Sequence, residues 1–246
     1  MMRFAFIALL FCMPWAAQAQ LGADTTRNAD STAGIVYNKL ERDTIDWRPR
    51  SMRLSVDLAG PARLVLNDSA VYLEAAADIQ FDNYHLVVEG GYANVEHGLP
   101  ESPVYQQFYY AMNGVFGRVG VDVNLLGNSE KFGTNGAFFG VRYGQALFND
   151  YLYFPPENND LGWPVNSNGY EYTNTNASAR WWEAVGSLRT QVWSGLHVGY
   201  SVRYRFGYQV ISDVDHEPYA IPGMGRVNAI PWFVNAHVSW VLPFSR

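Results

Sequence analysis

The chain has 246 residues, the size of one all-β domain, with 17 Lys and Arg against 23 Asp and Glu and a formal net charge of −6. This acidic balance argues against a basic surface for nucleic acid. Aromatic residues make up 15% of the chain and Lys39 and Lys131 are its only lysines, whereas a soluble domain uses lysine freely on its surface.

Residues 1–19 have the pattern of a secretory signal peptide. Arg3 is the basic start, Phe4 to Cys12 is a short apolar segment, and Ala17-Gln18-Ala19 is an A-x-A cleavage site. The apolar segment is too short to span a bilayer, which takes about 20 residues. A buried N-terminal helix is the alternative interpretation.

Cys12 is the only cysteine of the chain. A lipoprotein would need a small residue directly before it, and Phe11 stands there. Cleavage after Ala19 would leave a mature chain with neither a disulfide nor a thiolate. Residues 20–51 follow as a polar stretch without periodicity, which we interpret as a periplasmic lead.

Eight segments of the mature chain alternate apolar and polar residues with period 2. In Leu196–Phe206 every second residue from Leu196 is apolar, and the residues between are polar or glycine. This period predicts strands with one apolar face, and about eleven residues suffice for a tilted membrane strand. The predicted strands are Met52–Leu58, Val71–Phe81, Tyr84–Asn94, Val115–Asn124, Gly136–Phe148, Ala179–Val192, Leu196–Phe206 and Pro231–Phe244.

The connections between these strands alternate in length. Asp82-Asn83 and Trp193-Ser194-Gly195 are tight turns, and Leu125–Asn135 is of medium length. The long connections are Ala59–Ala70, Val95–Tyr105, Asn149–Ser178 and Gln209–Ala229. Short periplasmic turns and long extracellular loops are typical of bacterial outer-membrane barrels. We therefore predict an all-β fold over residues 52–246, an eight-stranded antiparallel up-and-down transmembrane β-barrel.

The polar faces of the predicted strands carry as many basic as acidic residues. They are Arg53, Asp57, Glu74, Asp78, Glu89, Arg118, Asp122, Arg142, Glu183, Arg189, Arg203 and Arg205. Side chains just fill the interior of an eight-stranded barrel, and charges enclosed there must be paired. Arginine suits forked pairing with carboxylates. We expect a lumen charge network, with structural importance.

A soluble β-sandwich also alternates and is the alternative fold. Aromatic residues toward the strand ends favour the membrane barrel, because they form girdles at the two interfaces. The last strand adds an alternation of Trp240, Leu242 and Phe244, which is typical of the assembly signal of outer-membrane proteins. Ser245 and Arg246 still follow the aromatic residue. The expected partners are the barrel assembly machinery during insertion, and outer-membrane lipid and lipopolysaccharide afterwards.

Four stretches of the chain carry a resemblance to a family. They are Leu54-Ser55-Val56-Asp57-Leu58, Phe139-Gly140-Val141-Arg142-Tyr143-Gly144, Ala220-Ile221-Pro222-Gly223-Met224-Gly225 and the closing strand to Phe244. In their order and spacing the chain resembles a poorly characterised family of small bacterial outer-membrane barrels, a domain of unknown function. The resemblance implies the barrel and a location in a Gram-negative outer membrane, and it implies no activity.

Two clusters contain residue types that could serve catalysis. His237-Val238-Ser239 is similar to the His-x-Ser of outer-membrane lipid A deacylases, but both side chains point inward in the predicted register, and no acidic partner follows. The second cluster is Asp213, Asp215, His216 and Glu217, which could bind a cation or supply acid and base groups. Its spacing fits no calcium loop. A lumen hydrogen-bonding pair and a solvated loop are the simpler interpretations.

We predict no enzyme, no metal site and no cofactor. His85, His97 and His197 share no metal-ligand spacing. The stretch 149–178 combines aromatic residues with Asn, Pro and Gly, which is typical of adaptable binding loops. Its candidates for recognition are Tyr151, Tyr153, Phe154, Trp163, Tyr170 and Tyr172. An aromatic loop that folds over the barrel mouth is the alternative.

The preferred hypothesis is a structural or surface-recognition barrel with long extracellular loops and an unknown ligand. A narrow pore for small solutes or ions is the first alternative, and an outer-membrane enzyme acting on lipid or peptide is the second.

Overall fold

The computed structural model describes residues 47–61, 70–98, 108–127, 135–154, 157–158, 164–166, 169–213, 217–227 and 229–244. The signal peptide predicted for residues 1–19 and most of the lead 20–51 lie outside the described residues. The first strand begins at Pro49, three residues before the predicted start of the barrel. Among the described residues, no helix is long and apolar enough to cross a membrane.

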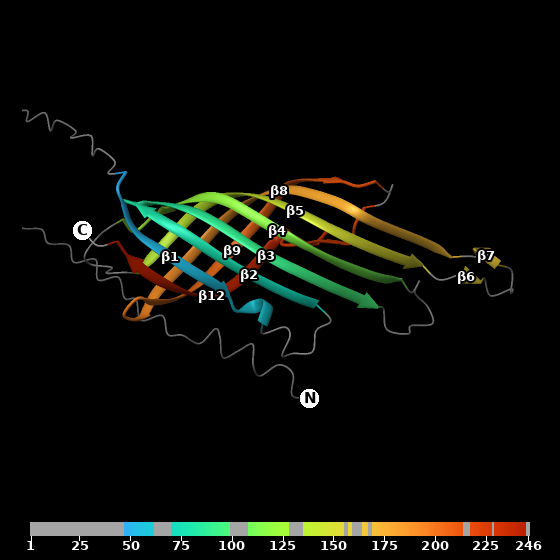
Figure 1. Ribbon diagram of the computed structural model, residues 1–246, viewed down its shortest axis with the longest axis horizontal. Helices are drawn as coiled ribbons and strands as arrows, with labels where there is room; N and C mark the ends of the chain where they lie inside the picture. The colour runs from blue at the N-terminus through green and yellow to red at the C-terminus, as the bar shows by residue number, and fades with distance from the viewer. Residues whose placement is uncertain are drawn as a thin grey trace, which may run out of the picture. The chain divides into compact units, whose positions relative to one another are not determined.

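Eight long strands close into a barrel in the order β1-β12-β9-β8-β5-β4-β3-β2. Their bounds are β1 Pro49–Asp57, β2 Ala70–Phe81, β3 Tyr84–Gly98, β4 Tyr109–Asn124, β5 Gly136–Phe154, β8 Tyr170–Trp193, β9 Leu196–Ile211 and β12 Trp232–Pro243. All neighbours pair antiparallel, and β12 closes on β1. The start of β1 and the end of β12 lie at the same end of the barrel (Figure 1). The predicted eight-stranded antiparallel up-and-down barrel is confirmed.

Two short hairpins accompany the barrel among the described residues. β6 (Glu157–Asn158) pairs with β7 (Pro164–Asn166) between β5 and β8. β10 (Ala220–Ile221) pairs with β11 (Gly225–Arg226) between β9 and β12. β6 and β7 lie at the end opposite the termini, which we call the loop end, and the other end is the turn end (Figure 1). β10 and β11 belong to the connection from β9 to β12, which is also at the loop end.

The tight turns lie where the alternation predicts them. Phe81 pairs with Tyr84 across the Asp82-Asn83 turn, and Asp82 adopts a left-handed φ of 52°. Aspartate tolerates this conformation better than most residues, which explains its position in a two-residue turn. Trp193 likewise pairs with Leu196 around Gly195. These registers fix which residues face inward on all four strands.

The predicted loop 149–178 is wrong at both ends, because residues 149–154 and 170–178 belong to long strands. β5 continues to Phe154 and β8 begins at Tyr170, and these two residues pair. The register shifts on β8 opposite Phe148 and Asp150, so that Asn174 and Ala177 both face inward. Such a bulge inverts the phase of the alternation, which conceals the strand from a period-2 search.

The outer face of the barrel is apolar between two levels of aromatic residues. At the loop end Trp232 pairs with Tyr204, their ring centroids 4.9 Å apart, and at the turn end Trp240 pairs with Leu196. Trp232 and Trp240 are eight residues apart, about 26 Å along the strand or about 20 Å along the axis of a strand tilted by about 40°. Exposed apolar side chains of the band include Leu54, Val56, Leu73, Leu86, Val88, Val115, Val119, Val121, Val141, Leu188, Val202 and Val234.

Candidate functional site: the filled barrel interior

Glu89 is the hub of the ion pairs in the middle of the barrel. Its carboxylate lies 2.8 Å from Nη1 of Arg118, 2.6 Å from Nη1 of Arg203 and 3.3 Å from Nε of Arg142. These three arginines come from β4, β9 and β5, so that they reach Glu89 from both sides of the barrel axis. Glu89 is 5% exposed, and three guanidinium groups therefore compensate one buried carboxylate.

Two further glutamates complete what we call the central ion-pair layer (Glu74, Glu89, Arg118, Arg142, Glu183 and Arg203). Glu74 accepts from Nη1 of Arg118 at 2.9 Å and from Nη2 of Arg203 at 3.2 Å. Glu183 lies 3.2 Å from Nη1 of Arg203 and also accepts a 2.7 Å bond from Nε1 of Trp181. The layer joins β2, β3, β4, β5, β8 and β9 across the interior.

Arg142 links this layer to a second group of charges nearer the turn end. Its Nη1 and Nη2 lie 2.7 and 2.8 Å from the two carboxylate oxygens of Asp122 in a forked pair. Nη2 of Arg189 lies 3.6 Å from the same carboxylate. The planar guanidinium makes such bidentate pairs, which lysine does not.

Asp78 is the second acidic member of the turn-end group. Its carboxylate lies 2.9 Å from Nδ1 of His85, 3.5 Å from Nη1 of Arg189 and 3.8 Å from Nη1 of Arg53. The Arg189 and Arg53 guanidiniums also lie 4.5 and 5.7 Å from the ring centroid of Phe138, as cation–π contacts. Charged side chains and the ring of Phe138 thus fill the interior at the turn end.

Asp57 and Arg205 depart from the predicted network of twelve residues. Asp57 accepts hydrogen bonds from the backbone N–H groups of Ala59 and Gly60 at 3.1 and 2.7 Å, and so fixes the start of the first loop. Arg205 donates to the carbonyls of Pro231 and Ile230 at 3.3 and 2.9 Å. Neither forms a carboxylate–guanidinium pair among the described residues. The ten others form ion pairs, five arginines with five carboxylates.

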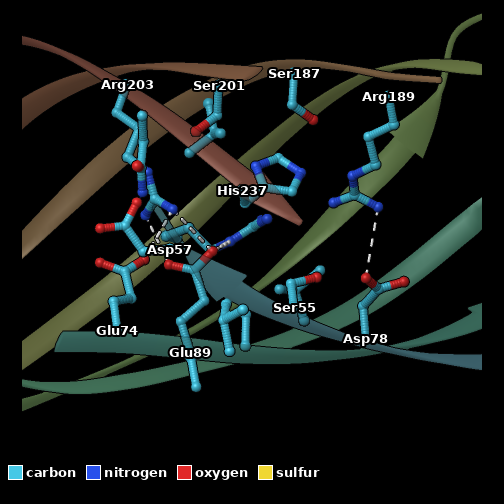
Figure 2. A pocket seen from close by; sticks show the side chains of 17 residues that line it. Ser55, Asp57, Glu74, Asp78, Glu89, Ser187, Arg189, Ser201, Arg203 and His237 are labelled. Carbon is cyan, nitrogen blue, oxygen red and sulfur yellow. Dashed lines mark hydrogen bonds and ion pairs between the residues drawn. The ribbon is translucent and has the colours of Figure 1, made fainter. Parts of the chain in front are cut away.

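A small polar chamber lies beside the central ion-pair layer (Figure 2). Its volume is about 40 Å³, which is room for water but not for a solute. Figure 2 shows the carboxylates of Glu74 and Glu89 beneath Arg203, and the separate contact of Arg189 with Asp78. Ser201 and Asn235 also line the chamber, each with a buried oxygen that has no protein partner, so ordered water fits the chemistry of this space.

The loop-end half of the interior is filled differently, by apolar side chains. Residues 218–227, which we call the plug hairpin, contain β10 and β11 and fold back into the barrel. Ile221 and Pro222 are almost fully buried, and Ile221 and Met224 belong to one apolar cluster with the inward-facing Trp181. The predicted long connection 209–229 is present between β9 and β12, and its middle folds inward, which the sequence analysis did not predict.

Hydrogen bonds from two wall residues, Tyr110 and Arg118, hold the plug hairpin in place. Tyr110 Oη donates to the carbonyl of Ala220 at 3.0 Å, and Arg118 Nη2 donates to the carbonyl of Gly223 at 2.7 Å. The second bond connects the plug hairpin directly to the central ion-pair layer. The signal in the sequence was the uncharged run Ala220–Gly225, which carried the family resemblance but has no periodicity that predicts inward folding.

A large side chain fits inside this narrow barrel where it packs against a small residue of the neighbouring strand. The indole of Trp181 lies against Gly144 on β5, where an added Cβ would overlap its ring. Trp181 is fully buried, whereas the neighbouring Trp182 is 45% exposed on the outer face. The pairing of large with small inward residues fills the barrel without widening it.

The predicted recognition residues are spread along the β5–β8 hairpin. Tyr151, Tyr153 and Phe154 lie on β5 and Tyr170 and Tyr172 on β8, while Trp163 lies outside the described residues. Phe154 and Tyr172 pack against the internal apolar cluster. Tyr151 contacts Tyr109 with ring centroids 6.0 Å apart. The structure thus divides this set between interior and surface.

The described members of the two candidate catalytic clusters lie in different surroundings. Ser239 is 1% exposed and His237 lines the polar chamber. Glu217 accepts a 2.7 Å bond from Tyr208, Asp213 is exposed, and residues 215 and 216 lie outside the description. Among the described residues, no three His, Cys, Asp or Glu side chains are grouped to hold a metal ion.

The residues of the predicted assembly signal, Trp240, Leu242 and Phe244, are half-exposed on the outer face. Trp240 and Leu242 pair with Leu54 and Met52 of β1 and therefore lie at the seam of the barrel. Recognition by an assembly machinery remains a prediction.

A family model described as domain of unknown function DUF6048 matches residues 1–246. The chain belongs to this family. No curated protein matches the chain. Two crystal structures, Acinetobacter baumannii CarO2 and CarO, are similar at 12% and 8% identity with TM-scores of 0.40 and 0.36. They cover 80% and 82% of this chain and 98% and 100% of their own, and such low scores carry no function over to it.

Proposed function

We propose that the chain is a barrel of a Gram-negative outer membrane with a lumen closed to ions and solutes, and that it serves a structural or surface-recognition role at its loop end. The observation that carries this proposal is the filled interior. The central ion-pair layer and the plug hairpin block the axis one after the other, and they are joined through Arg118 and Gly223.

The apolar outer band supports a membrane location. The band is about 20 Å high between the two aromatic levels, which is close to the apolar band of about 25 Å that outer-membrane barrels have. A soluble barrel would have to expose Trp232, Trp240 and Val234, each more than half exposed, to water. Both termini of the barrel belong in the periplasm, which puts the plug hairpin and the β5–β8 hairpin outside the cell.

Closure of the lumen follows from the energetics of the central ion-pair layer. A solute or hydrated ion could pass only if Arg118 or Arg203 left its carboxylates, and a buried charge without its partner costs several kcal/mol. The polar chamber of about 40 Å³ lies beside these ion pairs. It can hold water, but it is too small to form a continuous channel through the barrel. A non-enzymatic role is supported by the burial of Ser239, which is 1% exposed and therefore out of reach of a lipid substrate.

Conductance in a planar lipid bilayer tests the proposal. Protein refolded without residues 1–19 is first checked for a heat-dependent shift on gels, which reports a folded barrel. We expect insertion without discrete current steps. Reproducible ion-selective steps would contradict the closed lumen and favour the narrow pore, and Arg203→Ser would then change the step size. Failure to insert into any bilayer would contradict the membrane location itself.

A further inference from the structure

A second cavity opens at the loop end, outside the ion-pair layer and separate from the polar chamber. It is about 490 Å³ in volume and lies between β2, β3, the plug hairpin and the start of β12. We call it the mouth pocket, and its lining includes Tyr72, Glu96, Arg205, Tyr219, Arg226 and Trp232. Sites for small molecules usually have about 300–1,000 Å³. The mouth pocket is thus large enough for a ligand, whereas the polar chamber is not.

Arg205 is held in position at the wall of this pocket. Its Nε and Nη2 donate to the carbonyls of Pro231 and Ile230, which fixes the plane of the guanidinium. The remaining Nη1 lies beside Gly225, another residue of the pocket lining, where an added Cβ would be 3.1 Å away. No carboxylate lies within 4.0 Å of Arg205 among the described residues. A guanidinium that carbonyl groups hold in place, and that has no carboxylate beside it, can bind an anionic ligand without rearranging.

Arg226 supplies a second guanidinium to the same pocket. It stacks on the ring of Tyr219 at 5.0 Å, and it also lacks an ion pair among the described residues. Glu96 is the acidic residue of the lining, so two arginines face one carboxylate in a chain whose net charge is −6. This local excess of positive charge contrasts with the ion-pair layer below, where arginines and carboxylates are equal in number.

Aromatic side chains also line the mouth pocket. Tyr72, Tyr219 and Trp232 lie in the lining with the arginines. Aromatic rings with hydroxyl and indole groups at the rim suit a body with apolar and polar edges, such as a sugar ring, and forked guanidiniums suit a carboxylate or phosphate. An acidic sugar combines the two features.

We propose that the mouth pocket binds a small organic anion, a sugar-sized ring that carries one carboxylate or phosphate group, with Arg205 as the main anchor and Arg226 as the second. The inference rests on the proposed function, because only a barrel with its loop end outside presents this pocket to ligands from the cell's surroundings.

Isothermal titration calorimetry of the refolded barrel in neutral detergent micelles tests the inference. The probes are glucuronate and glucose 6-phosphate, with glucose as the ring without charge and inorganic phosphate as the charge without ring. We expect saturable binding of at least one anionic sugar, weakened about tenfold or more for both incomplete probes. Added salt should weaken binding further, because the anchors are partly exposed. Preference between glucuronate and the phosphate ester identifies the anionic group.

Four variants locate the site. Arg205→Gln should weaken binding about tenfold and the more exposed Arg226→Gln about threefold. Ala229→Trp keeps both charges but fills the pocket, and it should abolish binding even if Arg205→Gln disturbs the loop. Arg50→Gln is the matched control, because it removes an arginine that pairs with Asp82 at 2.9 Å at the turn end, and binding should be unchanged.

Three outcomes would overturn the inference: no binding of any probe by a folded barrel, equal binding of glucose, or full binding by Ala229→Trp. These results are distinguishable from failure of the proposed function. A closed barrel that binds no anionic sugar refutes the ligand but keeps the closed lumen, and a conducting barrel that binds one does the reverse.

Discussion

The two halves of the barrel interior are filled by opposite chemistry. In the turn-end half and the middle, side chains of the wall itself meet in ion pairs, with Glu89 bonded to three arginines. In the loop-end half, a segment that does not belong to the wall folds back and packs Ile221 and Met224 against Trp181. The turn-end half and the middle are filled by charged side chains of the strands, and the loop-end half is filled by apolar side chains of a separate hairpin and of the wall.

This difference has consequences for stability and movement. The members of the central ion-pair layer come from six long strands, so the loss of one of them weakens contacts across the whole barrel. The plug hairpin forms a sheet of its own that pairs with none of the long strands, and Tyr110 and Arg118 connect it to the wall, so we expect it to detach while those strands remain paired. Local openings of this kind cost less than global unfolding. We therefore expect charge variants to act globally and plug variants to act locally.

The largest effect is expected for Glu89→Gln. The substitution keeps the shape of the side chain but leaves Arg118, Arg142 and Arg203 with one carboxylate fewer in a buried layer. Loss of one member of a buried network costs about 3–5 kcal/mol. The free energy of unfolding by guanidinium chloride, followed by tryptophan fluorescence in micelles, should fall by that amount.

Glu96→Gln is the matched control, since it makes the same change on the same strand at an exposed position. It should change the free energy of unfolding by about 0.5 kcal/mol or less. If the two variants are equally stable, the central ion-pair layer contributes little to the free energy of unfolding. The proposed global role of the charged half would then be wrong.

The charged half could be predicted from the sequence because it obeys the alternation. Once Leu196–Phe206 is a strand, Arg203 must face opposite to Val202, and the same holds for Glu89 and Arg142 on their strands. The alternation does not predict at which height along the barrel axis an inward-facing side chain lies. Arg205 shares the face of Arg203 but lies above the layer, where the carbonyls of Ile230 and Pro231 replace a carboxylate as its partner.

The apolar half could not be predicted in this way. Ile221 is buried because the wall around it offers Tyr110, Phe116 and Trp181, and these contacts are far apart in the sequence. The run Ala220–Gly225 is too short and too rich in glycine to show a period. The bulge at Ala177 hides the long β8 for a related reason, since one extra residue inverts the phase of the pattern.

A smaller and local effect is expected for Gly223→Ala. Gly223 has a left-handed φ of 74°, and a Cβ at this position would overlap the ring of Phe116. The plug hairpin should therefore open more readily by about 1–3 kcal/mol. Trypsin cleavage after Arg226 should accelerate roughly tenfold or more. The free energy of global unfolding should change much less.

Gly186→Ala provides the control for this substitution. Gly186 lies on β8 with a negative φ and no atom within 4 Å of an added Cβ, so cleavage after Arg226 should keep its wild-type rate. A global loss of stability in Gly223→Ala, equal to that in Glu89→Gln, would show that the plug hairpin and the wall unfold together.

The smallest effect is expected for Tyr110→Phe. The variant keeps the buried ring but removes the hydroxyl that donates to the carbonyl of Ala220 at 3.0 Å and accepts from its N–H at 3.4 Å. One such bond contributes about 1 kcal/mol, so tryptic cleavage after Arg226 should accelerate about fivefold. Tyr109→Phe is the control, because this neighbour on β4 is exposed on the outer side. If Tyr110→Phe leaves cleavage unchanged while Gly223→Ala accelerates it, apolar packing and the Arg118 bond hold the plug hairpin, and the two halves of the interior are connected through the charged layer alone.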